Sequence, residues 1–157
     1  MMRVGVFSDT HGDLSRLSMA LKEMGEIDAF LHLGDFGTDA EAIQKVVNVP
    51  FYAVRGNCDF VKKYPAEEIV ELEGARLFLA HGDQFRDIYS LAYRAEEAHC
   101  QMALYGHTHI PLFTAQGPLL ILNPGSLTRP LGGSQPSCAL LEIEKGEIHV
   151  RMIPLQL

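Results

Sequence analysis

The chain has 157 residues, of which 47% are hydrophobic and 21% are charged. This length and balance predict a single domain over residues 1–157 with a core of its own, and they exclude a disordered chain. The formal net charge of −7 makes binding to nucleic acid or to an anionic membrane unlikely as a general property, because both need a basic surface.

The start of the chain carries no apolar run long enough for a signal peptide, since only residues 4–7 are apolar before Ser8. No other run approaches the ~20 apolar residues that span a bilayer. The cysteines, Cys58, Cys100 and Cys138, form no Cys-x-x-Cys pair, which disfavours a disulfide framework or a thiolate zinc site. We therefore expect a cytoplasmic protein with no membrane contact.

The first two thirds of the chain predict strands that alternate with helices. Short apolar segments predict buried strands at residues 4–7, 29–33, 51–54, 77–80 and 102–105. Helices are expected around residues 14–24, with Asp13 as a cap, and at residues 39–47 and 88–99. Such alternation is typical of an α/β fold with a largely parallel sheet.

The last third predicts a more antiparallel arrangement. Strands are expected at residues 111–114, 119–122, 139–144 and 147–153. The pair Lys145-Gly146 predicts a hairpin turn between the last two strands.

Metal-capable side chains follow each of the five early strands directly. They are Asp9, His11, Asp35, Asn57, His81, His107 and His109. In open α/β sheets, ligands bind beyond the carboxyl ends of the strands, so these side chains are expected to meet in one crevice. In extended chain, residues two apart point the same way, so Asp9 with His11 and His107 with His109 could each grip one metal. The glycines before three of the ligands, Gly34, Gly56 and Gly106, would allow tight turns there.

Each of these residues has an ordinary interpretation when it is taken alone. An Asp or Asn after a glycine is usually a turn residue, and a histidine after a strand is usually on the surface or packed. Five strand ends that all carry nitrogen or oxygen ligands are much harder to explain in this way. The ligand set suits manganese, iron, zinc or nickel rather than a soft metal.

The motifs Asp-x-His, Gly-Asp, Gly-Asn-x-Asp, His-Gly-Asp and Gly-His-Thr-His occur in this order between Asp9 and His109. In this respect the chain resembles the calcineurin-like metallophosphoesterase family, and its short length resembles the small YfcE-type phosphodiesterases. The loop Asn123-Pro124-Gly125-Ser126 also matches, so the resemblance covers nearly the whole chain. It implies a four-layer α/β/β/α sandwich of the metallophosphoesterase type.

The resemblance also implies a set of ligands and a reaction. Asp9, His11 and His109 would hold one divalent ion, Asn57, His81 and His107 would hold a second, and Asp35 would bridge the two. The two ions would be Mn²⁺ as the first choice. A hydroxide between them would attack the phosphodiester of a small phosphorylated substrate. Whether the protein is a homo-oligomer and which ester it cleaves are left open.

Further residues near these motifs were considered as members of the site. Cys58 stands where the larger family has a histidine that assists the leaving group, and a thiol is a weaker proton donor, although the YfcE-type members also carry cysteine there. Asp59 is expected to support the loop through hydrogen bonds, with a plain turn residue as an equal alternative. Arg55 and Arg129 are candidate phosphate contacts, with a solvated arginine as the alternative. Of the histidines outside the motifs, His32 is expected to be packed near the site and the others, His99 and His149, to be exposed.

Two alternatives to the phosphoesterase remain. The resemblance includes a retromer subunit, which makes a non-catalytic, protein-binding scaffold on the same fold the main competitor. A metal-dependent nuclease is disfavoured by the acidic balance and by the lack of a basic stretch interleaved with aromatic residues. Because all seven ligand positions are occupied by capable residues, the enzyme is favoured.

Overall fold

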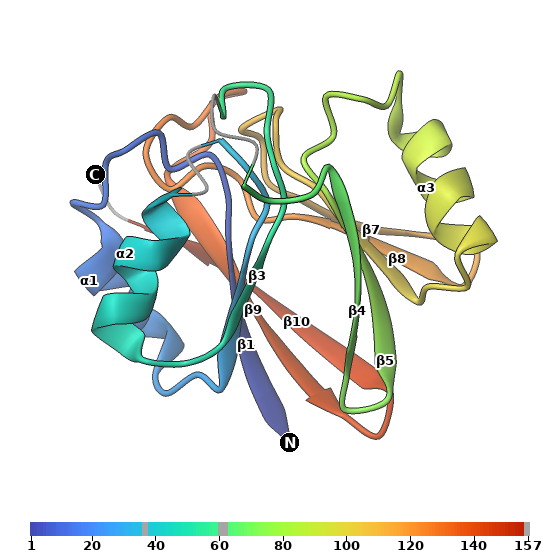
Figure 1. Ribbon diagram of the computed structural model, residues 1–157, viewed down its shortest axis with the longest axis horizontal. Coiled ribbons are helices and arrows are strands. Elements are labelled where there is room, and N and C mark those ends of the chain that lie inside the picture. The colour runs from blue at the N-terminus through green and yellow to red at the C-terminus, as the bar shows by residue number, and fades with distance from the viewer. Residues whose placement is uncertain (36–37, 60–62, 156–157) are drawn as a thin grey trace.

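The computed structural model describes residues 1–35, 38–59 and 63–155. In these ranges two five-stranded sheets pack face to face, and helices cover their outer faces (Figure 1). Helices α1 (Leu17–Met24) and α2 (Thr38–Val47) lie against one sheet, and α3 (Ile88–Glu97) lies against the other. The predicted α/β/β/α architecture is confirmed.

The first sheet has the order β10-β9-β1-β2-β3. Its strands are β1 (Met2–Phe7), β2 (Ala29–His32), β3 (Phe51–Ala53), β9 (Ser137–Glu144) and β10 (Glu147–Pro154). Strands β1, β2 and β3 are parallel, whereas β9 runs antiparallel to both β1 and β10.

The second sheet has the order β4-β5-β6-β8-β7. Its strands are β4 (Glu67–Leu72), β5 (Ala75–Ala80), β6 (Met102–Leu104), β7 (Leu112–Gln116) and β8 (Leu119–Asn123). Strands β5, β6 and β8 are parallel, and the edge strands β4 and β7 are antiparallel to their neighbours. The five early strands therefore do not form one largely parallel sheet, as their alternation with helices suggested, but divide between two mixed sheets.

Strand β4 was not predicted from the sequence. Three of its six residues are glutamate, so it has no continuous apolar run. It is an edge strand in which only Val70 and Leu72 are buried, and a half-exposed edge needs few apolar residues.

The ends of two predicted helices differ from expectation. Asp13 does not cap α1, which begins at Leu17 after Arg16 without a side-chain cap. The Asp13 carboxylate instead accepts a hydrogen bond from the Ser15 backbone N–H at 3.0 Å, a local turn that competes with helix capping. Helix α3 ends at Glu97 rather than at residue 99, and Asp87 caps its start by accepting from the Ser90 N–H.

Strand β5 shows how the sequence fills three apolar layers. Leu77 and Leu79 point into the core between the sheets, whereas Phe78 and Ala80 point toward α3. All four are fully buried, which explains the uninterrupted apolar run of this strand. Replacing a leucine in such a layer by alanine typically costs about 2–5 kcal/mol. A third layer lies under α1 and α2.

The two ends of the sandwich differ in their role. At one end the predicted Lys145-Gly146 turn joins β9 to β10, and the Gly146 N–H donates to the Glu73 carbonyl of the β4–β5 turn at 2.8 Å. At the other end lie the carboxyl ends of the parallel strands of both sheets. This second end carries the candidate site. None of the helices in the described ranges is long and apolar enough to cross a bilayer.

Candidate metal centre

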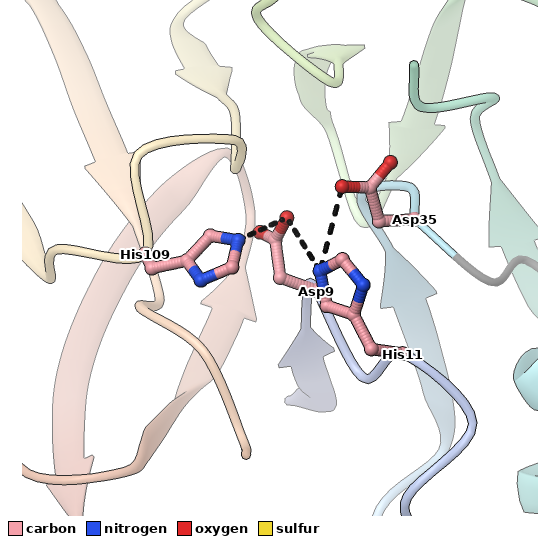
Figure 2. Close-up of side chains that lie close together, drawn as sticks. All are labelled: Asp9, His11, Asp35 and His109. Atoms are coloured by element: carbon pink, nitrogen blue, oxygen red, sulfur yellow. Dashed lines mark ion pairs between the residues drawn. The ribbon is translucent and has the colours of Figure 1, made fainter. Parts of the chain in front are cut away.

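Four of the predicted ligands gather in one tight cluster. Ligand atoms of Asp9, His11, Asp35 and His109 all lie within 4.8 Å of one another (Figure 2). Asp9 follows β1, Asp35 follows β2, and His109 lies in the loop between β6 and β7, so the cluster joins the two sheets. This set is the predicted first metal site together with the predicted bridge.

The backbone at the ligands is unusual. Five of the seven predicted ligands have a positive φ, between 49° and 66°: Asp9, His11, Asp35, His107 and His109. Residues other than glycine rarely adopt this left-handed conformation, and such outliers concentrate at functional sites. We expected the paired residues to converge because their chain is extended. They converge instead because each loop turns sharply after its strand.

Two of the glycines before ligands provide space rather than turns. A Cβ atom at Gly106 would lie 2.0 Å from Ser8 Oγ and 2.6 Å from Asp9 Oδ2, and one at Gly56 would lie 2.3 Å from Asp35 Oδ1. Only Gly34 has the positive φ, 101°, that the tight-turn expectation requires. These glycines let the loops approach closely enough for the carboxylates to meet.

Asp35 faces the histidines of both predicted ligand sets. Its Oδ2 atom lies 3.5 Å from Nε2 of His11 and 3.4 Å from Nε2 of His81. Its Oδ1 atom accepts a hydrogen bond from the Cys58 backbone N–H at 2.8 Å, which fixes the carboxylate. One oxygen is thereby held between two imidazoles from different loops.

Asp9 is the second carboxylate of the cluster and is fully buried. Its Oδ1 atom lies 3.2 Å from Nε2 of His109, 3.8 Å from that of His81 and 3.9 Å from that of His11. Its Oδ2 atom accepts hydrogen bonds from Ser8 Oγ and from the His107 backbone N–H.

Two buried ligand atoms lack a hydrogen bond from the described residues, Asp9 Oδ1 and His81 Nε2. Buried polar atoms are normally satisfied, so such exceptions need an explanation. Both atoms point toward the same cluster of carboxylates and imidazoles. The residues present therefore fit a divalent cation, which accepts ligation from carboxylate oxygen and imidazole nitrogen.

Backbone carbonyls orient two of the histidines. Nδ1 of His81 lies 2.7 Å from the Leu33 carbonyl, and Nδ1 of His109 lies 2.7 Å from the Arg129 carbonyl. A carbonyl can only accept, so each Nδ1 carries the proton and each Nε2 is directed at the carboxylates. Metal-binding histidines are commonly held in this way.

The charges of the cluster shift its pKa values. Burial lowers the pKa of His81, but contact with Asp35 and the charge of Asp9 outweigh it and raise the pKa to about 8. Burial likewise opposes the charged form of Asp35, yet contact with His81 brings the pKa of Asp35 well below its usual range. Both shifts favour a protonated His81 beside an ionised Asp35 when no metal is bound.

The second predicted set is arranged more loosely. His107 Nδ1 lies 3.2 Å from Asn57 Oδ1, and both residues are exposed. The rings of His81 and His107 are 5.2 Å apart between centroids, the same separation as His11 and His109 in the first set. The structure thus brings Asn57 and His107 together and connects them to the cluster through His81.

Cys58 and Asp59 occupy different places in the loop after β3. The half-buried Cys58 thiol has its pKa raised by burial and by the charge of Asp35, so it is not an activated nucleophile. The Asp59 carboxylate accepts from the backbone N–H groups of Gly56, at 2.8 Å, and Asp35, at 3.1 Å. Asp59 therefore positions the loops that carry Asn57 and Asp35.

Other residues that hold the ligands were missed at the sequence level. Ser126 Oγ donates to the Asp9 carbonyl at 2.9 Å, and Asn123 Nδ2 donates to the Gly106 carbonyl at 3.0 Å. Both belong to the segment Asn123-Pro124-Gly125-Ser126, which was noticed only as a matching motif. The segment begins at Asn123, the last residue of β8, and β8 is a sixth parallel strand that ends at the same edge; this position was the available signal.

The remaining candidate residues are three histidines outside the motifs and two arginines. His32 is fully buried and its Nε2 lies 3.0 Å from Thr10 Oγ1 beside the Asp9 loop, while His99 and His149 are exposed. Arg55 is half-buried and lines a cavity with Asn57. Arg129 is exposed; its backbone carbonyl orients His109, and its backbone N–H donates to Ser126 Oγ at 2.8 Å.

Comparison with protein families identifies the family to which this fold and these motifs belong. The model of the calcineurin-like phosphoesterase superfamily domain matches residues 2–146. The chain belongs to this superfamily. The family resemblance inferred from the sequence motifs is thereby confirmed.

Individual relatives match this chain along most of their length. The "Probable metallophosphoesterase YsnB" of Bacillus subtilis is 29% identical over 154 residues, which cover 96% of this chain and 89% of the relative. The phosphodiesterase YfcE of Escherichia coli is 30% identical over 168 residues, with 90% and 88% covered.

Solved structures show the same fold. A predicted phosphoesterase from Streptococcus pneumoniae superposes with a TM-score of 0.81 at 30% identity, covering 98% of this chain and 89% of that one. Vps29 of Entamoeba histolytica, solved in complex with zinc, superposes with a TM-score of 0.79 at 23% identity, covering 98% and 99%. The likeness to Vps29 concerns the fold alone.

Proposed function

We propose that this chain is a phosphodiesterase that holds two divalent ions and hydrolyses small phosphorylated esters. Asp9, His11 and His109 would bind one ion, Asn57, His81 and His107 the other, and Asp35 both. When bound, such a pair of ions would provide an activated hydroxide and balance the charge on the attacking and leaving oxygens. Mn²⁺ is proposed first, with iron, zinc and nickel suited to the same donors.

The observation that carries this proposal is the position of Asp35. Its Oδ2 atom lies within 3.5 Å of Nε2 of His11 and of His81, one histidine from each ligand set. A single carboxylate oxygen between two imidazoles is what a bridging ligand requires. The preference for diesters is supported by the relative that is named a phosphodiesterase.

The surrounding residues would bind and orient the substrate. Arg55 and Arg129 are the proposed phosphate contacts, since each lies beside the ligand loops. Asp59 would keep Asn57 and Asp35 at a fixed separation. The Cys58 thiol, protonated at neutral pH, could donate a hydrogen bond to the ester but would not attack it.

The competing proposal is a protein-binding scaffold on the same fold. A scaffold does not need strained residues at the ligand positions. Five of the seven proposed ligands nevertheless hold a left-handed backbone, which costs conformational energy. We therefore favour the enzyme.

Chelation and one substitution test the proposal. Hydrolysis of bis(4-nitrophenyl) phosphate should stop with EDTA and return with Mn²⁺. Asp35→Asn should lower turnover by at least about 100-fold, because even residues that only support metal ligands typically contribute 10–100-fold. Asp13→Asn is the matched control, since Asp13 is an exposed aspartate in the His11 loop and contacts Ser15.

Near-wild-type turnover of the Asp35→Asn protein would exclude Asp35 as the bridge. Failure of every tested metal to restore hydrolysis of any ester would favour the scaffold.

A further inference from the structure

A cavity of about 290 Å³ adjoins the candidate metal centre on one side. Its walls come from two segments, residues 82–91 and residues 105–108. The first segment follows His81, and the second contains His107, so two proposed metal ligands connect directly to these walls. His107 is the one proposed ligand among the residues that line the cavity.

The walls combine apolar and polar side chains. The apolar ones are Phe85, Ile88, Leu91 and Tyr105, and the polar or charged ones are Asp83, Arg86, Asp87, His107 and Thr108. Leu91 is 1% exposed, and the Phe85 ring packs edge-on against Phe78 with centroids 6.2 Å apart. Both walls are thus anchored in the core under α3, and the cavity is preformed rather than a gap between mobile side chains.

The rim of the cavity is polar. The Arg86 side chain is 89% exposed, with its Nε atom 3.8 Å from Asp87. The Asp87 carboxylate is occupied in capping α3 through Ser90. Arg86 is thus an exposed cation among the residues that line the cavity.

A second cavity near the candidate metal centre is more polar than the first. This cavity, also about 290 Å³, is lined by Arg55, Gly56, Asn57, Asp59, Ala66, Asp83 and Gln84, most of them polar. Asp83 lines both cavities, which places them on two sides of one loop. A phosphodiester carries two organic groups, and the first of these two cavities offers the more apolar surface.

We propose that the cavity between α3 and the His107 loop binds an aromatic substituent of the phosphodiester. This inference rests on the proposed function. A volume of about 290 Å³ is near the lower limit of small-molecule sites, roughly 300 Å³, and it suits one ring system rather than a large ligand. Phe85 and Tyr105 offer ring faces or edges against which an aromatic group packs well.

The test compares two non-hydrolysable ligands that differ only in the ring, phenylphosphonate and methylphosphonate. Both are titrated into the full-length, zinc-loaded protein and followed by amide chemical shifts. Phenylphosphonate should bind roughly tenfold more tightly, because the ring buries apolar area worth at least that factor. Its ring-dependent shifts should centre on Phe85, Ile88 and Thr108.

Matched variants locate the ring. Ile88 and Tyr89 are the first two residues of α3, where an aspartate is compatible with the helix start, but Ile88 lines the cavity and Tyr89 is 67% exposed. Ile88→Asp should abolish the preference for the phenyl ligand, whereas Tyr89→Asp should keep it. Ile88→Ala, which adds no charge and is the variant less prone to unfold, should reduce the preference about threefold.

Equal phenyl preference in the Ile88 and Tyr89 variants would overturn the proposal, as would ring-dependent shifts that centre on Arg55 and Gln84. The binding test and the hydrolysis test can fail separately. If the protein hydrolysed no ester with any metal but still preferred phenylphosphonate through Ile88, the cavity assignment would be supported and the proposed function would be refuted.

Discussion

The candidate ligands are held in backbone conformations that their side chains do not favour. A left-handed conformation costs a residue other than glycine about 1–2 kcal/mol, and five of the seven ligands adopt it. Glycine would be less strained at each position, yet glycine could not bind a metal. The positions therefore indicate that the side chains are there for their chemistry and that the rest of the fold compensates for the strain.

Cys58 is the residue from which the chemistry of the leaving group can be tested. Its pKa is raised, so the thiol is a poor proton donor to a departing oxygen. General acid catalysis typically contributes about 10²–10⁴-fold, most for basic leaving groups. The protein should therefore cleave activated aryl diesters far faster than alkyl diesters, and Cys58→His should narrow this difference.

The measurement is the rate over a graded series of aryl and alkyl phosphodiesters for both proteins, with the metal content of each determined. A flat dependence on leaving-group basicity in the unmodified protein would show that proton donation at this position does not limit the reaction. A Cys58→His protein that loses metal would be uninformative about protonation, which is why the metal content is measured alongside.

At the level of elements, the site depends on close contacts between loops from different sheets. The loop after β6 approaches the loop after β1 so closely that Gly106 has no room for a side chain against Ser8 and Asp9. The His107 N–H donates to Asp9 Oδ2 across the same contact at 3.0 Å. The two loops therefore determine each other's position.

Gly106→Ala tests this dependence. The added methyl group would meet Ser8 Oγ at 2.0 Å and Asp9 Oδ2 at 2.6 Å, so the Asp9 carboxylate must move. We expect metal affinity to fall by about 10–100-fold, as for other losses of support around a metal site, while the fold is retained. Calorimetric metal titration and circular dichroism measure the two effects.

Gly117→Ala is the control, because a Cβ atom there meets nothing within 4 Å. Gly117 lies in the β7–β8 turn and, unlike Gly106, has a positive φ of 60°, so its substitution adds backbone strain but no steric clash. Unchanged metal affinity in the Gly106→Ala protein would contradict the close-contact account.

At the level of the whole molecule, the site lies where two parallel strand groups from separate sheets end at one edge. The sequence predicted the strands of both groups, because a strand buried on two faces is continuously apolar, as in β5. It could not assign them to two sheets from periodicity, because both sheets bury both faces of their central strands. That division came from the family motifs.

The candidate site was predictable at the level of residue type and less so at the level of geometry. Asp9, His11, Asp35 and His109 meet as their positions after the strands suggested. The left-handed turns that aim them were not predictable, because aspartate and histidine adopt this conformation more often than most residues but still only in a minority of positions. Supporting contacts such as Ser126 with the Asp9 carbonyl, 117 residues apart in the chain, depend on tertiary structure.

The proposed hydrolysis needs two metal ions per chain, and a titration tests this requirement. Metal-free protein is titrated with Mn²⁺ while the rate of phosphodiester hydrolysis and the bound metal are measured together. We expect the rate to rise until two equivalents are bound and then to level off. A rate that reaches its maximum at one bound equivalent, or no hydrolysis at two, would contradict this expectation.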